Sequence, residues 1–508
     1  MLTSEIIKII NTIEDRFPVA SWEMNGIKIW PLLRIRLNFD LYYLHQTTVH
    51  ATSGNNFLAK FFLRTRKVVS YLRAVTVDFN KNQSVKTQYD AVFLSDGVSF
   101  TKVDGQWYEK FCEPLITIFK RNSFQNCLLT PVNSYLIPRK APSKFIQPRL
   151  TTLSAVAALR ARYCKPRDIV LPGYTEVMTY LAESGCGVNL PSQLALYRLV
   201  CQLETFSGYF ISLLSKLKPA VSFVVSYYNT EGMAFNLACH RLKIPCIDIQ
   251  HGVQGELHVA YGRWNNIPAT GFELLPSHFW CWSDEDAAAI NAWSKSVSMH
   301  HKPLVGGNLW LDLWKTGEPD FVKSYDNKIS ALKKTLPPCK HVLATLQFNL
   351  DDANTLSPLL TAIRDSDKNW FWWVRLHPCM LSRREYIRGI LQQTGNLNFE
   401  LDTATDLPLY ALLRHMDVHV THSSSTVIEA KDFGIPSVIF SHYGMEFFPD
   451  QIASGWALVA DNENVLNCLD SQLTRLHLLV QNDTKTATPN KALLTVLEML
   501  RQRRSDSK

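Results

Sequence analysis

The sequence lacks several patterns that would assign it at once to a familiar class of protein. Its 11 cysteines form no Cys-x-x-Cys pair and no Cys/His cluster at zinc-ligand spacing, so we predict reduced thiols and no metal site. No stretch reaches the roughly 18 to 20 uninterrupted apolar residues of a membrane-spanning helix. The first residues show no basic start, apolar run and small-residue cleavage site in series, so we expect no signal peptide.

Three nucleotide and hydrolase motifs are also missing. The sequence contains neither G-x-x-x-x-G-K-[ST] nor G-x-G-x-x-G, which argues against a P-loop NTPase and a standard dinucleotide site. The absence of G-x-S-x-G makes an α/β-hydrolase a poor fit. We predict no bound cofactor.

What the chain does have is a large apolar core and an uneven charge. With 508 residues, 46% of them hydrophobic, it is long enough for two folded domains. Residues 1–170 hold 24 Lys plus Arg against 12 Asp plus Glu, whereas the remainder holds 29 against 33. A basic first third favours an anionic partner, such as a lipid surface or a charged glycan.

Residues 57–73, FLAKFFLRTRKVVSYLR, show the clearest amphipathic pattern in this basic region. Phe57, Phe61, Val68 and Leu72 fall on one stripe at a 3.6-residue period, and the cations lie off it. Two interpretations stay open: a helix on an anionic membrane surface, and a structural helix with a solvated basic face. A second distinctive string, Trp22 to Arg34, is aromatic-rich and indicates a docking segment.

From about residue 89 short apolar runs alternate with helical segments, which is typical of parallel βαβ units. The predicted strands of the first series are Tyr89–Leu94, Cys127–Thr130, Asp168–Leu171, Ala220–Ser226 and Cys246–Gln250, with helices at Pro191–Lys216 and Glu231–Leu242. In the second series, strands are predicted at 341–348, 370–378, 397–403, 418–424 and 436–441, with helices between them and a linker region at 305–340. We therefore predict an α/β, GT-B-like fold of two Rossmann-like doubly wound domains facing a cleft.

The predicted organisation has four parts. Residues 1–88 form a basic, helical, N-terminal segment that associates with membranes in one of the two interpretations above. Residues 89–304 form the first Rossmann-like domain and 305–480 the second, followed by a C-terminal helix and tail at 481–508.

Ligands of such sheets bind beyond the carboxyl ends of the strands, so residues just after each strand are the candidates. In the second domain Ser423, Ser424, Ser425 and Thr426 stand between a strand and a helix, where hydroxyls and helix N–H groups bind phosphate. Four hydroxyl residues are more than an N-cap needs. His377, held extended by Pro378, follows another strand after Arg375. Glu429 fits a ribose contact and equally an acid that complements the helix dipole.

In the first domain the candidates are Glu231 and His251. His251 follows a strand and precedes Gly252, which permits a tight turn, while Glu231 follows the neighbouring strand. A carboxylate and a histidine at adjacent strand ends suit a base and its proton relay. Glu231 also fits an ordinary first-turn helix acid. Asp96 after the first strand is a weaker candidate of the same kind.

These motifs together resemble bacterial GT-B glycosyltransferases of surface polysaccharide synthesis. Residues 250–252 (Gln-His-Gly), 375–378 (Arg-Leu-His-Pro) and 423–425 (Ser-Ser-Ser) occur in the matching order, and the resemblance covers about residues 219–460. The His-Pro and Ser-Ser motifs are most similar to bacterial sialyltransferases, polysialyltransferases and Kdo transferases, and similar motifs occur in CDP-glycerol polymerases. One departure is Thr230, which stands before Glu231 where the sialyltransferase pattern has an acid.

The resemblance implies a metal-independent glycosyltransferase that moves a CMP-linked sugar, such as Kdo or sialic acid, onto lipopolysaccharide or capsular polysaccharide. It places Arg375, His377, Ser423, Ser424, Ser425 and Glu429 around the nucleotide-sugar donor, and Glu231 and His251 at the catalytic step. The expected partners are the donor, a glycan or glycolipid acceptor and an anionic membrane surface at residues 57–73, without nucleic acid. The expected location is cytoplasmic or peripheral on the inner face of the plasma membrane. A CDP-glycerol or UDP-sugar transferase, and a non-catalytic scaffold of the same fold, stay open as alternatives.

Overall fold

The computed structural model describes residues 3–47, 88–132, 136–347, 353–461, 464–481 and 490–506. These residues divide into two compact units. The first comprises Met1–Phe100, Gln106–Leu309 and Asn490–Lys508, and the second comprises Thr101–Gly105 and Trp310–Pro489. The amphipathic stretch 57–73 lies outside the described residues, so the two interpretations of it stay open.

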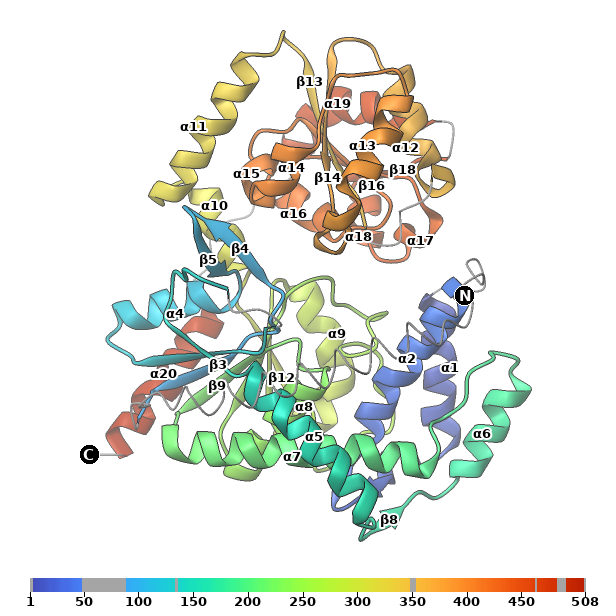
Figure 1. The fold of residues 1–508 in the computed structure, drawn as a ribbon, viewed down its shortest axis with the longest axis vertical. Helices are drawn as coiled ribbons and strands as arrows, with labels where there is room; N and C mark the ends of the chain where they lie inside the picture. The colour runs from blue at the N-terminus through green and yellow to red at the C-terminus, as the bar shows by residue number, and fades with distance from the viewer. Residues whose placement is uncertain are drawn as a thin grey trace. The chain divides into compact units, whose positions relative to one another are not determined.

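The first unit is built on a seven-stranded sheet in which every neighbouring pair is parallel. Figure 1 labels β3, β9 and β12 of this sheet. Across the sheet the strands run β12 (Lys302–Val305), β11 (His278–Cys281), β10 (Cys246–Ile249), β9 (Val221–Val225), β3 (Ala91–Leu94), β6 (Asn126–Thr130) and β7 (Ser143–Phe145). Numbered along the chain from β3 and read from the β7 edge, the strand order is 3-2-1-4-5-6-7, the doubly wound order of Rossmann folds. The order reverses between β3 and β9.

Helices cover both faces of this sheet, which is why its central strands β3 and β9 are buried along their whole length. The helices of the first unit are α1 (Thr3–Arg16), α2 (Trp30–Thr47), α4 (Cys112–Arg121), α5 (Gln147–Tyr163), α6 (Tyr174–Glu183), α7 (Gln193–Leu217), α8 (Thr230–Leu242), α9 (Asp284–Ser294) and α20 (Lys491–Asp506). Apolar residues of α1, α2, α7 and α8 share one buried cluster with one face of the sheet. Those of α4 and α20 share another with the opposite face.

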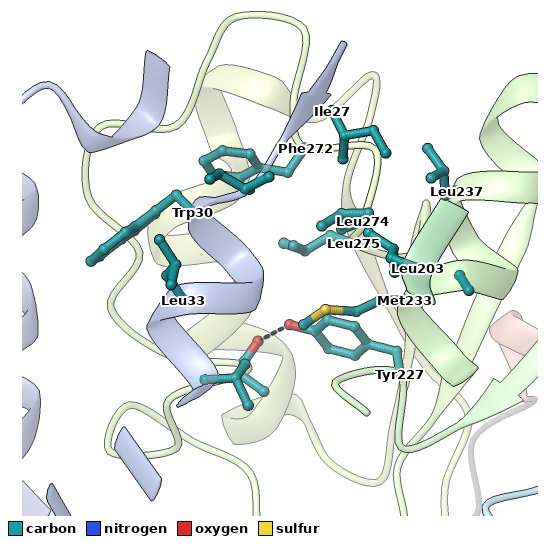
Figure 2. Close-up of a cluster of buried hydrophobic side chains, with 14 of the residues drawn as sticks. Ile27, Trp30, Leu33, Leu203, Tyr227, Met233, Leu237, Phe272, Leu274 and Leu275 are labelled. Carbon is teal, nitrogen blue, oxygen red and sulfur yellow. Dashed lines mark hydrogen bonds between the residues drawn. The ribbon is translucent and has the colours of Figure 1, made fainter. Parts of the chain in front are cut away.

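The N-terminal residues therefore belong to the core of the first unit. Figure 2 shows Trp30 and Leu33 of α2 in the same buried cluster as Tyr227, which follows β9, and Met233 of α8. Strands β1 (Glu23–Met24) and β2 (Ile27–Lys28), which lie between α1 and α2 in the chain, form a small antiparallel sheet with β8 (Ile169–Val170). Strands β4 (Phe100–Val103) and β5 (Gln106–Glu109) pair with each other.

The second unit repeats the plan with six parallel strands. Their order across the sheet is β15 (Phe399–Glu400), β14 (Trp370–Arg375), β13 (Lys340–Thr345), β16 (Val418–Thr421), β17 (Ser437–Ile439) and β18 (Ala457–Val459). Numbered from β13 this is again 3-2-1-4-5-6, and the order reverses between β13 and β16. The helices are α10 (Leu309–Thr316), α11 (Asp320–Lys334), α12 (Ala353–Asp365), α13 (Arg384–Gln393), α14 (Asp402–Asp406), α15 (Leu409–Leu413), α16 (Thr426–Asp432), α17 (His442–Met445), α18 (Pro449–Ala453) and α19 (Val465–Gln481). Short 3-10 helices at Val19–Ser21, Lys295–Val297 and Pro378–Arg383 complete the described elements of the two units.

The predicted fold class, α/β with two Rossmann-like units of the GT-B kind, is confirmed. One local prediction is wrong in its placement. The strand expected at Asp168–Leu171 is present as β8, but it pairs antiparallel with β1 outside the large sheet, because its two residues are exposed and cannot occupy a sheet covered on both faces. The region 305–340, predicted as a linker, contains the boundary between the two units at Leu309 and Trp310, and it also contains α10 and α11.

No helix among the described residues combines the length and the apolar character needed to cross a membrane.

Candidate functional site

In the second unit, a glutamine links the ends of β13 and β16, the two strands between which the strand order reverses. Gln347 follows β13 and Ser423 follows β16, the neighbouring strand. The Gln347 Oε1 atom accepts hydrogen bonds from both the backbone N–H and the Oγ of Ser423, each at 2.9 Å. Gln347 was not among the sequence-predicted site residues, because the predicted strand 341–348 included it, whereas β13 ends at Thr345.

The serine run forms the turn into α16, as the sequence predicts. Ser424 Oγ lies 2.9 Å from Thr426 Oγ1 and accepts from the Thr426 N–H at 3.3 Å. Ser425 is the N-cap residue of α16, and its side chain makes no capping hydrogen bond. The structure therefore brings Ser423, Ser424 and Ser425 together with Gln347 at the place where Rossmann-like sheets bind ligands.

His377 follows β14, which neighbours β13 in the sheet. Its Nδ1 accepts a hydrogen bond from the backbone N–H of Cys379 at 3.2 Å, as the N-cap of a short 3-10 helix. With Nδ1 as an acceptor, a neutral imidazole carries its proton on Nε2. His377 is therefore a hydrogen-bond donor at the same sheet edge as the serine turn.

Arg375 has a structural contact that the sequence did not indicate. Its Nη1 donates to the backbone carbonyls of Ala404, at 2.6 Å, and Leu407, at 2.5 Å. These carbonyls lie at the end of α14, so the guanidinium fixes that helix relative to β14. Burial lowers the pKa of Arg375 to about 10, which still leaves it charged at neutral pH. Its contact with a donor stays a prediction.

Glu429 is buried in α16, and its Oε1 accepts a hydrogen bond from the Tyr410 hydroxyl at 3.2 Å. His422, between β16 and the serines, was missed by the sequence analysis. Its Nδ1 lies 3.0 Å from Ser423 Oγ, and burial lowers its pKa to about 4, so it is neutral at pH 7. His422 supports the serine turn without adding charge.

In the first unit the reversal lies between β3 and β9 and carries an acid. Asp96 follows β3; its Oδ1 accepts from the N–H groups of Val98 and Ser99, both at 2.9 Å, and its Oδ2 accepts from Ser99 Oγ at 2.6 Å. Ser226, which follows β9, adopts a φ of 61°, a conformation that non-glycine residues rarely adopt. Such strained residues cluster at functional sites, so this edge is a candidate site in its own right.

His251 follows β10, the strand next to β9, as predicted. Its Nε2 lies 3.2 Å from the Tyr228 hydroxyl, and the two rings are 5.9 Å apart. Burial lowers the pKa of His251, while the nearby Asp96 carboxylate opposes that shift. Its Nδ1 is buried and has no hydrogen-bond partner within the described part of the chain. The structure thus holds a neutral imidazole with one unsatisfied nitrogen.

Glu231 lies in the first turn of α8, whose N-cap Asn229 accepts from the Gly232 N–H at 2.6 Å. Burial raises the pKa of the Glu231 carboxyl, as a general base requires. Within residues that the structure describes, no hydrogen bond or ion pair joins Glu231 to His251. The catalytic roles of both stay predictions.

The loop after His251 carries side chains that sequence reasoning missed. Gln254 is only 6% exposed, and neither atom of its amide has a partner among the described residues. His258, whose ring is 5.5 Å from that of Tyr228, has a pKa lowered to about 3 by burial. Asp248, inside β10, accepts from the Tyr261 hydroxyl at 2.8 Å and the Tyr227 N–H at 3.0 Å. Burial raises the pKa of Asp248 to about 8.

No three His, Cys, Asp or Glu side chains of the described ranges come together as a metal site.

No family model and no curated protein sequence matches this chain. Among solved structures it is similar to a UDP-GlcNAc 2-epimerase from Neisseria meningitidis bound to UDP-GlcNAc, at 14% identity over 81% of this chain and 99% of that one, with a TM-score of 0.49. It is also similar to the wall teichoic acid polymerase TagF, at 11% identity, 88% and 98% coverage and a TM-score of 0.48. A third is the glycosyltransferase SnogD from Streptomyces nogalater, at 12% identity, 82% and 99% coverage and a TM-score of 0.37.

Proposed function

We propose that the protein is a glycosyltransferase that moves a sugar from a nucleotide-activated donor to a glycan or glycolipid acceptor. The observation that carries the proposal is the placement of hydrogen-bonding side chains at the strand-order reversals of both Rossmann-like sheets. In the second unit these are Gln347 and the serine turn, and in the first they are Asp96 and Tyr228, with His251 one strand further.

The charges at the two reversals assign the donor phosphate to the second unit. Asp96 places a carboxylate at the first reversal, where a phosphate would be repelled. The second reversal carries an amide, hydroxyls and the neutral His422 instead. Hydroxyls and N–H groups at a helix start bind phosphate oxygens, and His377 adds a donor from the next strand. We also propose that Arg375 contacts the nucleotide-sugar donor and that Glu429 binds the ribose of that donor.

The acceptor hydroxyl is activated in the first unit. A neutral His251 takes up the hydroxyl proton as the oxygen attacks the anomeric carbon and the nucleotide leaves with the bonding electrons. The Tyr228 hydroxyl, 3.2 Å from Nε2, orients the His251 ring for this step. Glu231, whose pKa burial raises, is the alternative base.

The finer form of the proposal is a CMP-linked Kdo or sialic acid donor and a lipopolysaccharide or capsular acceptor, at the inner face of the plasma membrane. It comes from the motifs in residues 219–460. A CDP-glycerol or UDP-sugar transferase and a non-catalytic scaffold are the alternatives. Isothermal titration against CMP, CDP, UDP, GDP and dTDP separates them, because binding of one nucleotide class names the donor and binding of none contradicts both enzyme proposals.

The donor site is tested by the separate changes His377→Ala and Ser424→Ala. Each removes a hydrogen-bonding group at the sheet edge, and we expect donor affinity to fall about 10- to 150-fold for each, since a hydrogen bond to a charged group contributes about 1.5 to 3 kcal/mol. Thr474→Ala is the control, because this exposed α19 hydroxyl donates to the Asp470 carbonyl of its own helix. Unchanged affinity in both site variants would place the phosphate elsewhere.

A further inference from the structure

The N-terminal helices contribute a buried ion pair that the proposed function leaves unexplained. Arg34 of α2 and Glu14 of α1 are both fully buried, and Arg34 Nη1 donates to Glu14 Oε1. Glu14 Oε1 also accepts from Trp30 Nε1 at 2.6 Å. The guanidinium carbon of Arg34 lies 4.2 Å from the centre of the Trp264 ring, in cation–π contact. Arg34 is the last residue of the Trp22 to Arg34 string, which the sequence analysis interpreted as a docking segment.

The remaining donors of Arg34 all bind backbone carbonyls of one distant segment. Its Nε donates to Val259 at 3.0 Å, and its Nη2 donates to Gly262 at 3.0 Å and to Arg263 at 3.1 Å. Glu14 binds the same segment through its other carboxylate oxygen, because Oε2 accepts a hydrogen bond from the Asn265 N–H at 2.8 Å. The ion pair is therefore a clamp on residues 259–265.

Further side chains complete the fixation of this segment. The Tyr227 hydroxyl donates to the Ala260 carbonyl, drawn as a dashed line in Figure 2, and Trp293 Nε1 donates to the Tyr261 carbonyl at 2.7 Å. With Arg34 on Val259, Gly262 and Arg263, five consecutive carbonyls have side-chain donors. Loops ordinarily satisfy such groups with water, so this degree of fixation marks a preorganised loop.

The clamped segment is continuous with the loop that begins at His251. His258 Nδ1 accepts from the Ala260 N–H at 3.2 Å, which couples the imidazole to the clamped backbone. The His258 ring packs against Tyr228, and the Tyr228 hydroxyl contacts His251 Nε2. Arg34 thus fixes the backbone at Val259, next to Ala260, and a chain of contacts runs from Ala260 through His258 and Tyr228 to His251.

Stability alone is a weak reason for this pair, because burying two charges costs desolvation energy that an apolar pair of similar volume would avoid. We infer that Glu14 and Arg34 are positioning residues that hold the loop 250–263 in the geometry that His251 and His258 require. The clamp itself is a property of the first unit, whereas its importance for sugar transfer rests on the proposed function.

The first test is Arg34→Lys, which keeps a positive charge beside Glu14 but lacks the planar fork that reaches three carbonyls at once. NMR titration of selectively labelled histidines reports the loop directly. In the wild type we expect His258 to stay neutral down to a pKa of about 3. In the variant, loosening should admit water and raise that pKa by at least one unit.

Arg414→Lys is the matched control. Arg414 also pairs with an acid, Asp326, at 2.8 Å and donates to a backbone carbonyl, but it lies in the second unit. It should lower the unfolding temperature without moving the His258 titration. If Arg34→Lys does not fold, Tyr227→Phe removes one anchor from the same loop and should shift the His258 pKa in the same direction by a smaller amount.

Two readouts separate this inference from the proposed function. An unshifted His258 titration in the folded variants overturns the positioning role, whatever the activity. If the titration shifts but the wild type transfers no sugar, the clamp stands and the proposed function fails. If both stand, Arg34→Lys should lower kcat at least tenfold and leave KM for the donor within twofold, because the donor binds in the other unit. A rise in KM with unchanged kcat would also overturn the inference.

Discussion

The change Gln347→Glu tests the phosphate site with a nearly isosteric charge. Gln347 Oε1 accepts two hydrogen bonds, from the Ser423 N–H and from the Ser423 hydroxyl, and a carboxylate oxygen can accept both of them as well. The variant therefore adds one negative charge at the second reversal without removing a contact. It should fold as well as the wild type, and its charge near the start of α16 favours the helix dipole by about 0.3 to 1 kcal/mol.

The expected loss of donor affinity follows from distance. Ser423 Oγ is 2.9 Å from Gln347 Oε1. A phosphate bound at the next residue of the turn, one further hydrogen bond away, would place its charge roughly 7 Å from the new carboxylate. At an effective dielectric constant of about 20, two unit charges at that separation repel by about 2.4 kcal/mol, which weakens binding roughly 50-fold.

Isothermal titration with the nucleotide identified in the panel measures the effect. Gln393→Glu is the matched control, because Gln393 is an exposed residue at the end of α13, toward the opposite edge of the same sheet. It adds the same charge and should change the dissociation constant by less than twofold. A Gln347→Glu variant that binds within threefold of the wild type, with an unchanged unfolding temperature, would refute a phosphate site at this reversal.

Three further predictions concern the first unit. Tyr228→Phe removes the hydroxyl that lies 3.2 Å from His251 Nε2, and we expect transfer about tenfold slower with unchanged donor affinity, measured by steady-state kinetics and titration; equal kcat would contradict a role for this contact. Gln254→Met removes a buried amide that has no partner among the described residues. Thermal unfolding should therefore show a gain of about 1 to 3 kcal/mol in unfolding free energy, and the acceptor KM rises if the amide binds the acceptor. A loss of stability would show that the amide is satisfied. Asp248 has a folded pKa of about 8, above its ordinary 3.8, so the folded state retains a proton that the unfolded chain releases, and stability falls as pH rises between these values. At about 1.4 kcal/mol per pH unit, Asp248→Asn should remove about 2.7 kcal/mol of the difference in unfolding free energy between pH 5 and pH 7. Denaturant unfolding at the two pH values measures this difference, and an unchanged difference in the variant would refute the pKa shift.

The strands at the centre of both sheets were predictable because they are buried on both faces. Ala91–Leu94 is a continuous apolar run and Val221–Val225 is apolar except for Ser222, the pattern that a parallel sheet covered by helices imposes. The missed strands β7, β11, β12 and β18 have three or four residues and lie at an edge of the sheet or next to it, and so few residues carry little periodic signal. Asp168–Leu171 looked like a sheet strand because local propensity does not record which partner a strand finds.

The candidate site was predictable to the extent that it depends on strand ends. The serine turn and the two histidines were found by their position after a strand, and the structure places them at or beside the order reversals. Gln347 and Gln254 were missed because a glutamine carries no chemical signature of its own. Only its burial and its hydrogen bonds distinguish it from a solvated residue.

The sequence by itself determined the two α/β units, because apolar periodicity and helix caps are local properties of the chain. It also determined which residues follow strands. The tertiary structure decided what those residues contact: that Arg375 faces the carbonyls of α14, that the serine turn is tied to Gln347, and that Arg34 grips a loop 225 residues away. Such contacts join segments that are remote in sequence, so they form only when strand order and helix packing bring the segments together.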